Sequence, residues 1–559
     1  MTVDEGRRRD TSPSGSGTGP DAVPGSLVAA WKARVARNPG GTALRFFDGA
    51  LSAREVDAAS DALAAAFEAR GTGRGDRVGV YLQNVPQYAL VLLALWKLGA
   101  TALGLNPMYR RRELRRIVED SGAVGVVCAD EDVHETLGTL AGSTVRWLIS
   151  TSALDYQSRN DPRVFATTER LAPAPDGDLV ALIGAYRGRR PAPVELTPED
   201  VAFLTYTSGT TGPPKGAMNT HANVLSVVAT CASWVRVDDG DVVFAMAPLF
   251  HITGAVVNAT LSLLTDTTLV LAGRFHPEVA LEAFAEHQVT YTIGSITAYN
   301  AIYELPQAGP EHFATAKALY SGGAPIPPAT VERFRERFGV YLHNGYGMTE
   351  TTSAVIAVPP GERAPVHLPS GTLSIGKPLP HLTARVVDLH GDPMPCGQQG
   401  ELELSGPQVV PGYWGKPEAT RRTMPEGRLR TGDVAVIDEQ GWVYLVDRLK
   451  DQINVSGYKV WPREVEDALY EHPSVLEAAV VGQPDEYRGE TVVAYVSLKA
   501  GLTASAEELI AFSRERLAAY KCPRTIHFLA DLPKTQSGKI RRAELRGLDG
   551  TEPDSPSKD

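Results

Sequence analysis

One glycine-rich segment constrains the fold of this chain more than any other. Residues 206–216 read YTSGTTGPPKG, and they lie between an apolar run at 201–204 and a helical pattern that begins at His221. Glycines in such a loop let backbone N–H groups come close to phosphate oxygens, while its hydroxyls add donors and its lysine adds a positive charge. We therefore expect a loop that binds nucleotide phosphates. Its expected contact residues are Thr207, Ser208, Gly209, Thr210, Thr211 and Lys215.

The spacing of this loop differs from that of an ordinary P-loop NTPase. A Walker A loop ends in Gly-Lys-Ser/Thr, whereas Gly212 is followed here by Pro-Pro-Lys-Gly. A mobile surface loop is the alternative interpretation, because clusters of Gly, Ser, Thr and Pro often have no other role. The remaining motifs of the chain decide between the two.

Short apolar runs alternate with helical patterns through the first part of the chain. Strand-like runs occur at 76–82, 123–128, 241–247, 268–271 and 289–293. Strands separated by helices favour parallel sheets that are covered on both faces. We therefore predict an α/β fold whose large N-terminal domain contains two sheet subdomains of the αβαβα type.

The character of the sequence changes near Leu382. Shorter strand-like runs with turns follow, which predicts a small β-rich subdomain, and a compact α+β segment comes after the run DRLK at 447–450. At 559 residues the chain is too long for one compact core. The expected parts are a disordered tail at 1–26, an N-terminal domain at 27–447 with its β-rich subdomain at about 382–447, a hinge at 448–450, a mobile C-terminal domain at 451–547 and a polar tail at 548–559.

Composition and charge exclude several kinds of partner. The net charge of −11 argues against a nucleic-acid partner, because proteins that bind phosphate backbones usually carry a basic face. The four cysteines are scattered without a CxxC pair, so they indicate neither a zinc site nor disulfides and fit a reducing cytoplasm. The most apolar run, 89–105, is interrupted by Lys97 and is shorter than the roughly 20 residues that cross a bilayer. We therefore expect a cytoplasmic protein without a membrane span.

Three later motifs carry groups that suit ATP chemistry. The two glycines of SGGAP at 321–325 let the backbone approach a planar ligand, because they have no Cβ atom. The run NGYGMTE at 344–350 offers an aromatic ring for stacking, a hydroxyl for phosphate in Thr349 and a carboxylate for Mg²⁺ in Glu350. Asp433 follows a glycine and can accept hydrogen bonds from both ribose hydroxyls. Together these groups predict an ATP site with a magnesium ion.

Taken in chain order, the motifs resemble those of the adenylate-forming enzymes. This superfamily contains acyl-CoA synthetases, aryl-CoA ligases, peptide-synthetase adenylation domains and beetle luciferases. The resemblance covers about 27 to 546 and is closest to bacterial fatty-acid and aryl-acid CoA ligases. Besides the glycine-threonine loop, the matching runs are PLFHITG at 248–254, SGGAP at 321–325, NGYGMTE at 344–350, TGD at 431–433 and PKTQSGKIRR at 533–542.

The resemblance implies roles for individual residues. Lys539 would bridge the acid and the α-phosphate, and His251 would act as a gate near the acyl site. Arg448 would help to fix the nucleotide, and Lys450 would be the hinge residue. The other implied nucleotide contacts are Gly323, Ala324, Pro325, Asn344, Gly345, Tyr346, Gly347 and Asp433. The implied acyl pocket is His251, Gly254, Thr297, Tyr299, Gly322 and Gly347, and the implied CoA loop includes Ser456, Gly457 and Tyr458.

The implied reaction has two steps. A carboxylate attacks the α-phosphorus of ATP while Mg²⁺ and the phosphate loop offset negative charge, and the thiol of CoA then displaces AMP from the acyl adenylate. Since Lys539 would obstruct the thiol, we expect the C-terminal domain to rotate about Lys450 between the steps. The run at 248–254 has no aspartate to pair with an ammonium group, which argues against an amino-acid substrate.

The sequence leaves the acid and the acceptor open. The acid pocket is predicted to be mainly apolar, with no placed cation or anion for a charged tail, so fatty, aryl and bulky polycyclic acids all fit. One alternative is a ligase that loads a carrier protein in trans, or a relative that performs only one half-reaction. Another is a nucleotide-binding module without chemistry, against which the joint presence of Lys215, Glu350, Asp433, Arg448 and Lys539 argues. A homodimer is compatible with the sequence.

Overall fold

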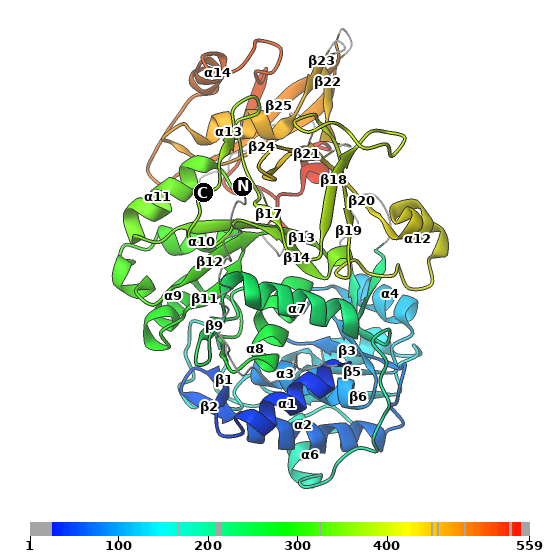
Figure 1. Ribbon diagram of the computed structural model, residues 1–559. Helices are drawn as coiled ribbons and strands as arrows, with labels where there is room; N and C mark the ends of the chain where they lie inside the picture. Colours follow the sequence, from blue (N-terminus) through cyan, green and yellow to red (C-terminus); the bar gives the residue numbers. More distant parts are fainter. Residues whose placement is uncertain are drawn as a thin grey trace, which may run out of the picture.

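The computed structural model describes residues 25–165, 167–207, 214–324, 326–448, 451–455, 458–485, 488–535 and 539–548. Figure 1 shows the first part of the chain in blue and cyan at one end, a large green sheet in the middle and the last part in orange and red at the other end. The predicted tails lie almost wholly outside the described residues. Among the described helices, none has the length and apolar composition that a membrane span requires.

A six-stranded sheet carries the glycine-rich loop. Its strands are β3 (Arg77–Tyr81), β4 (Thr101–Gly104), β5 (Gly125–Ala129), β6 (Trp147–Thr151), β7 (Val201–Tyr206) and β8 (Gly216–Thr220). The order is β6-β5-β3-β4-β7-β8, and only β7 and β8 are antiparallel. The loop therefore joins two neighbouring strands, and α7 (His221–Val235) begins directly after β8 with Thr220 as its cap. The predicted strand and helix are present, whereas the returning strand β8 was not predicted.

A nine-stranded sheet forms the centre of the molecule. Its strands are β1 (Thr42–Phe46), β2 (Gly49–Ser52), β9 (Val242–Phe244), β10 (Thr268–Leu271), β11 (Tyr291–Gly294), β12 (Ala318–Gly322), β13 (Leu342–Met348), β14 (Ser353–Ala357) and β17 (Lys377–Pro378). The strand order is β17-β14-β13-β12-β11-β9-β10-β1-β2. The strands from β1 to β13 in this order pair in parallel, while β2, β14 and β17 pair antiparallel at the two edges. The predicted parallel arrangement is confirmed for the centre of the sheet.

Helices cover both sheets and join their cores. They include α1 (Leu27–Arg37), α2 (Ala53–Glu68), α3 (Pro86–Lys97), α4 (Arg111–Ser121), α8 (Leu261–Leu264), α9 (Pro277–Glu286), α10 (Ile296–Tyr303) and α11 (Pro328–Phe338). Helix α3 is buried along its whole length, and one hydrophobic cluster contains α3 together with Val80 of β3 and Leu269 of β10. The two sheets therefore share one core, which fixes the edges that face the cavity described below.

The rest of the chain forms two smaller sheets. A four-stranded antiparallel sheet contains β18 (Thr383–Val387), β19 (Gly400–Ser405), β20 (Leu429–Ile437) and β21 (Val443–Arg448). The last sheet contains β22 (Ile453–Val455), β23 (Tyr458–Val460), β24 (Val475–Asp485), β25 (Gly489–Leu498) and β26 (Thr525–Phe528), with α13 (Pro462–Tyr470) and α14 (Ala506–Arg514). The β-rich and α+β character predicted for these regions is confirmed. The domain boundaries and the hinge stay predictions.

One local prediction at the start of β20 needs correction. The sequence suggests that Asp433 follows a glycine turn, but Asp433 lies inside β20 and pairs with Arg448 of β21. Gly432 has a φ of 73°, and the pairing of β20 with β19 shifts register between Glu401 and Glu403. A bulge within a strand has therefore replaced the expected turn, and it directs Asp433 to the buried side.

Arg34 ties the first helix to the nine-stranded sheet. Its buried guanidinium donates to the carbonyl oxygens of Ser262, Leu263 and Thr267 at 2.8, 3.2 and 2.7 Å. Three carbonyl groups at the end of α8 thus depend on one side chain. A buried carbonyl without a donor costs free energy, since water cannot replace the lost bond.

We predict that Arg34→Met lowers the free energy of unfolding by about 3 kcal/mol, because it leaves these carbonyls and Asp266 with fewer donors. Urea unfolding followed by circular dichroism measures the change. The matched control is Arg37→Met, whose side chain is 54% exposed and also contacts Asp266, and it should cost less than about 1 kcal/mol. Equal losses in both variants would contradict the importance of the buried bonds.

Candidate active site

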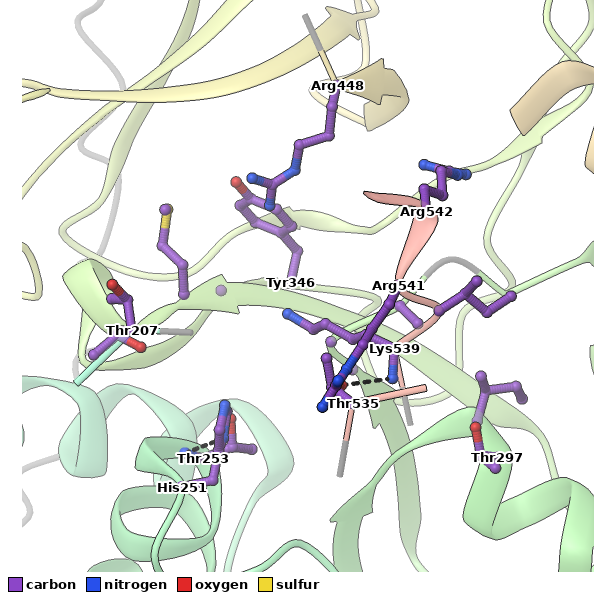
Figure 2. Close-up of a pocket in the computed structure, with 18 of the residues that line it drawn as sticks. Thr207, His251, Thr253, Thr297, Tyr346, Arg448, Thr535, Lys539, Arg541 and Arg542 are labelled. Atoms are coloured by element: carbon purple, nitrogen blue, oxygen red, sulfur yellow. Dashed lines mark hydrogen bonds between the residues drawn. The ribbon is translucent and has the colours of Figure 1, made fainter. Parts of the chain in front are cut away.

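A cavity of about 1570 Å³ opens where the parallel strands end. Its wall combines the ends of β7, β12 and β13 with β20, β21 and the segment at 539–546. Ligands of open α/β sheets bind at the carboxyl edge of the strands, where loops line a crevice. Figure 2 shows the side chains that converge there, with Lys539 between Tyr346 and the turn that carries His251 and Thr253.

The cavity brings together most of the predicted site residues that the structure describes. They come from eight separate segments of the sequence, so only the fold makes them neighbours. What each one binds stays a prediction. The residues in the wall are Thr207, Lys215, His251, Thr297, Gly322, Gly323, Ala324, Asn344, Gly345, Tyr346, Gly347, Thr349, Glu350, Asp433, Arg448 and Lys539.

Other predicted residues lie outside the described residues, so nothing is said of their structure. They belong to the phosphate loop, the SGGAP run, the hinge and the CoA loop. These residues are Ser208, Gly209, Thr210, Thr211, Pro325, Lys450, Ser456 and Gly457.

Two predicted acyl-pocket residues lie behind the wall of the cavity. Gly254 begins the buried π-helix at 254–260, and a Cβ atom on it would lie 2.2 Å from the carbonyl oxygen of Pro248. The glycine therefore permits close backbone packing. Tyr299 is fully buried and donates its hydroxyl to the carbonyl oxygen of Tyr320 at 3.0 Å. Both residues support the pocket from the core and do not line it.

Tyr458 of the predicted CoA loop also lies away from the cavity. Its side chain is 60% exposed, and its ring packs against Tyr520 with 4.9 Å between the ring centres. Lys539 of the same C-terminal unit lines the cavity instead. The structure thus has the arrangement in which the lysine, and not Tyr458, faces the site.

Asp433 is the centre of a buried hydrogen-bonded cluster. Arg448 Nε lies 2.6 Å from Asp433 Oδ1, and the hydroxyl of Tyr346 donates to Asp433 Oδ2 at 2.6 Å. Burial raises the pKa of Asp433, and the charge of Arg448 opposes this shift. The cluster places a carboxylate acceptor, a guanidinium and an aromatic ring side by side. That combination suits the ribose and base of a nucleotide.

Glu350 and Lys215 meet at one aromatic ring. Glu350 is buried, and the hydroxyl of Tyr413 donates to its Oε1 at 2.6 Å. Lys215 Nζ lies 4.8 Å from the centre of the Tyr413 ring, close enough for a cation–π contact. Sequence analysis did not assign Tyr413 to the site. The ring links the lysine of the phosphate loop to the predicted metal ligand.

Glu350 fits a magnesium ion only in company with phosphate. The described residues contain no group of three or more His, Cys, Asp or Glu side chains that could hold a metal ion. Mg²⁺ commonly takes one or two carboxylates and completes its coordination with substrate phosphates and water. One carboxylate beside a bound triphosphate therefore satisfies this chemistry.

Lys539 reaches the cavity beside a glycine. Its backbone N–H donates to Thr535 Oγ1 at 3.1 Å, and a Cβ atom on Gly323 would lie 3.4 Å from Lys539 Cε. Burial and the charge of Arg448 lower the pKa of Lys539. Lys539 in turn affects His251: burial and the charge of Lys539 lower the pKa of His251 to about 4. His251 is therefore neutral at pH 7.

Near the predicted acyl pocket, the cavity wall is more polar than the sequence suggests. Apolar side chains line it, among them Phe250, Ile293, Ile296 and Phe334. The wall also contains Asn300, Thr330 and Arg333, so the predicted absence of a placed cation needs correction. Helix α11 carries several charged residues, and no sequence pattern indicates which of them faces a cavity and which faces water.

Two family models match this chain. Residues 31–414 match the AMP-binding enzyme model, and residues 464–539 match the model of the AMP-binding enzyme C-terminal domain. The first match ends beyond the phosphate loop and the Glu350 run, and the second includes Lys539. The TGD run at 431–433 lies between the two matches and belongs to neither.

Individual proteins of known activity are similar to this chain along nearly its whole length. A long-chain-fatty-acid–CoA ligase of Bacillus subtilis is 35% identical and covers 91% of this chain and 92% of its own. A feruloyl-CoA synthase of Amycolatopsis is 34% identical over 93% of this chain and 98% of its own. The crystal structure of ATP-bound MatB from Rhodopseudomonas palustris has a TM-score of 0.83 at 27% identity, and it covers 93% of this chain and 98% of its own.

We predict that Lys539→Met raises the pKa of His251, because removal of a nearby positive charge makes its protonation easier. The value should stay below 6.5, since burial is the larger cause of the shift. NMR titration of histidine-labelled protein measures it, with His251→Asn used to assign the signal. Lys534→Met is the control. Lys534 lies on the same segment as Lys539 and pairs with Glu477, so its removal should leave the pKa of His251 unchanged. An unchanged value in Lys539→Met would show that Lys539 does not reach His251.

Proposed function

Because this chain belongs to the AMP-binding enzyme family and is an acid–thiol ligase, we propose that it converts a carboxylic acid to its CoA thioester through an acyl adenylate. The observation that carries the proposal is the meeting of Lys539 with Glu350, Asp433 and Arg448 in one cavity. We further propose a cytoplasmic location, which the four free cysteines support.

The first step requires two anions to approach each other. The acid carboxylate must reach the α-phosphorus of ATP, and repulsion opposes this in a cavity that excludes water. Lys539 would lie between the carboxylate and the α-phosphate, while Lys215 would face the departing pyrophosphate. Asp433 would accept bonds from the ribose hydroxyls, and Tyr346 would lie beside the base. The proposed contribution of these residues is position and charge, not a covalent bond.

A magnesium ion would complete the charge balance. Glu350 would hold it, and Tyr413 would fix the carboxylate through the bond to Oε1. When bound, the ion neutralises part of the negative charge on the phosphates.

The second step requires Lys539 to leave. The proposal is that the C-terminal unit rotates and exchanges Lys539 for the predicted CoA loop. Tyr458 of this loop now lies outside the cavity. A few contacts across the predicted hinge hold the present orientation. Asp447 Oδ2 accepts the backbone N–H of Arg463 at 2.9 Å, and the carbonyl oxygen of Leu445 accepts from Arg463 Nη1 at 3.0 Å. These bonds hold the start of α13 against β21, and they must break if α13 turns away.

The acceptor is the main alternative within this proposal. A carrier protein in trans would receive the acyl group through the same thiol chemistry, and a relative with a single active half-reaction would stop at the adenylate. Pyrophosphate release with an acid panel, followed by CoA or a phosphopantetheinylated carrier as acceptor, separates these cases. Thioester formation with CoA supports the proposal, and transfer to the carrier alone would redirect it.

We predict that Lys539→Ala lowers the rate of adenylation by at least about 100-fold, because the substitution removes a positive charge that would stabilise the transition state. Thioester formation from supplied acyl adenylate should stay within about threefold of the unchanged protein. Pyrophosphate release and acyl-adenylate consumption are measured separately. Lys534→Ala serves as the control, since Lys534 lies on the same segment and does not line the cavity. Equal losses in both half-reactions would count against the division of labour.

We predict that Asp447→Ala slows adenylation by about five- to tenfold, because a lost capping bond of about 1 kcal/mol shifts the balance of domain orientations. The thioester step from supplied adenylate should be unchanged or faster. Glu439→Ala is the matched control: it removes an exposed carboxylate from the turn between β20 and β21. If Asp447→Ala slows both half-reactions alike, Asp447 stabilises the fold and does not select an orientation.

A further inference from the structure

Two neighbouring helices give the acid side of the cavity a polar wall. Thr297 and Asn300 line it from α10, and Thr330 and Arg333 line it from α11. In each helix the two residues are three positions apart, which puts them on one face. The start of each helix adjoins the end of a parallel strand, β11 or β12, where the cavity opens. The polar wall therefore extends inward from the reaction site.

The two helices run side by side in the same direction. Tyr299 packs against Phe334 with 5.6 Å between ring centres, and Tyr303 packs against Phe338 at 5.9 Å. The second contact lies four residues beyond the first in both helices, so the two helices keep the same register. Arg333, which precedes Phe334, therefore lies at a level between Thr297 and Asn300. A ligand between the helices would meet Arg333 and Asn300 together.

Arg333 lacks a charged partner among the residues that the structure describes. It is partly buried, and its guanidinium donates one long hydrogen bond, 3.4 Å from Nη2 to Thr330 Oγ1. One turn later, Arg337 donates to the carbonyl oxygens of Tyr303, Leu305 and Ala308 and so closes the end of α10. The two arginines thus differ: Arg337 supports the fold, and Arg333 has donors left for a ligand.

The surrounding charges also favour an oxygen acceptor. Lys499 of the C-terminal unit lines the same cavity, and burial together with the charge of Arg333 lowers its pKa. The charge of Glu304, at the end of α10, raises the pKa of Lys499, but burial and Arg333 together outweigh it. Two cations and one carboxylate leave net positive charge at this end. Asn300 adds an amide whose side chain has no hydrogen-bond partner among the described residues.

We infer that the acid carries an oxygen-bearing group at its far end, which accepts hydrogen bonds from Arg333 and Asn300. This rests on the proposed function. A plain alkyl tail would cover the guanidinium and the amide without replacing their bonds to water, which is unfavourable. A hydroxyl, carbonyl or carboxylate oxygen would satisfy them. Asn300 lies four residues beyond Ile296, about 6 Å along the helix axis, so the group belongs well beyond the reacting carboxylate.

Matched acids test this inference. Pyrophosphate release is measured with octanoate, 8-hydroxyoctanoate and octanedioate, and with cinnamate and 4-hydroxycinnamate. We expect the kcat/KM of an oxygen-bearing acid to exceed that of its plain partner by about tenfold or more, as for one charge-assisted hydrogen bond. The hydroxy acids and the dicarboxylate separate a neutral acceptor from an anionic one.

Two variants show whether Arg333 is responsible. Arg333→Met should remove the preference by lowering the kcat/KM of the oxygen-bearing acid. The kcat/KM of the plain acid should not fall, because its tail no longer covers a guanidinium. Arg335→Met, on the same helix but outside the cavity wall and paired with Glu332, should keep the preference. A wild-type preference for plain acids, or an equal loss for both acids in Arg333→Met, overturns the inference and leaves the ligase proposal intact. No pyrophosphate release with any acid overturns both.

Discussion

The fold brings three cationic side chains from distant parts of the chain into one cavity, where the proposed adenylation would bring two anions together. Lys215 comes from the loop between β7 and β8, Arg448 from the end of β21 and Lys539 from the segment after the last sheet. Each has a separate partner that fixes it: the Tyr413 ring, Asp433 and the backbone turn with Thr535. Because these groups are partly or fully withdrawn from water, their charges act at greater strength than they would on the surface.

The C-terminal unit supplies one of those cations, so in the proposed mechanism its orientation would decide which half-reaction the cavity supports. Arg463 at the start of α13 donates hydrogen bonds to Leu445 and Asp447 of β21. Arg542 forms a bidentate salt bridge with Glu466. The first set of bonds crosses the predicted hinge, and the second lies within the C-terminal unit. Rotation would therefore break a few hydrogen bonds and keep the unit itself intact.

Near the predicted acyl pocket, some residues shape the cavity wall from behind and others line the cavity. Tyr299 and Gly254 shape the wall from behind, through a buried hydroxyl and a close backbone approach. Thr297, Asn300 and Arg333 present polar groups to the cavity from two helices in step. Residues from one short stretch, such as Thr297 and Tyr299, thus have opposite surroundings, because successive residues on a helix point about 100° apart.

The order of the motifs in the sequence predicts the family, and the alternation of strand-like and helical runs predicts the parallel sheets. The motifs also name a part of the cavity wall, since each motif sets local chemistry and backbone shape by itself. The confirmed predictions, such as the strand at β7 and the helix at α7, depend on neighbouring residues alone. Other features depend on residues far apart in the chain. The bulge that turns Asp433 inward, the ring of Tyr413 between Lys215 and Glu350, and the inward face of Arg333 arise from pairing and packing across elements. Local sequence could name the charged groups, but only the tertiary structure decided which of them leave water and meet.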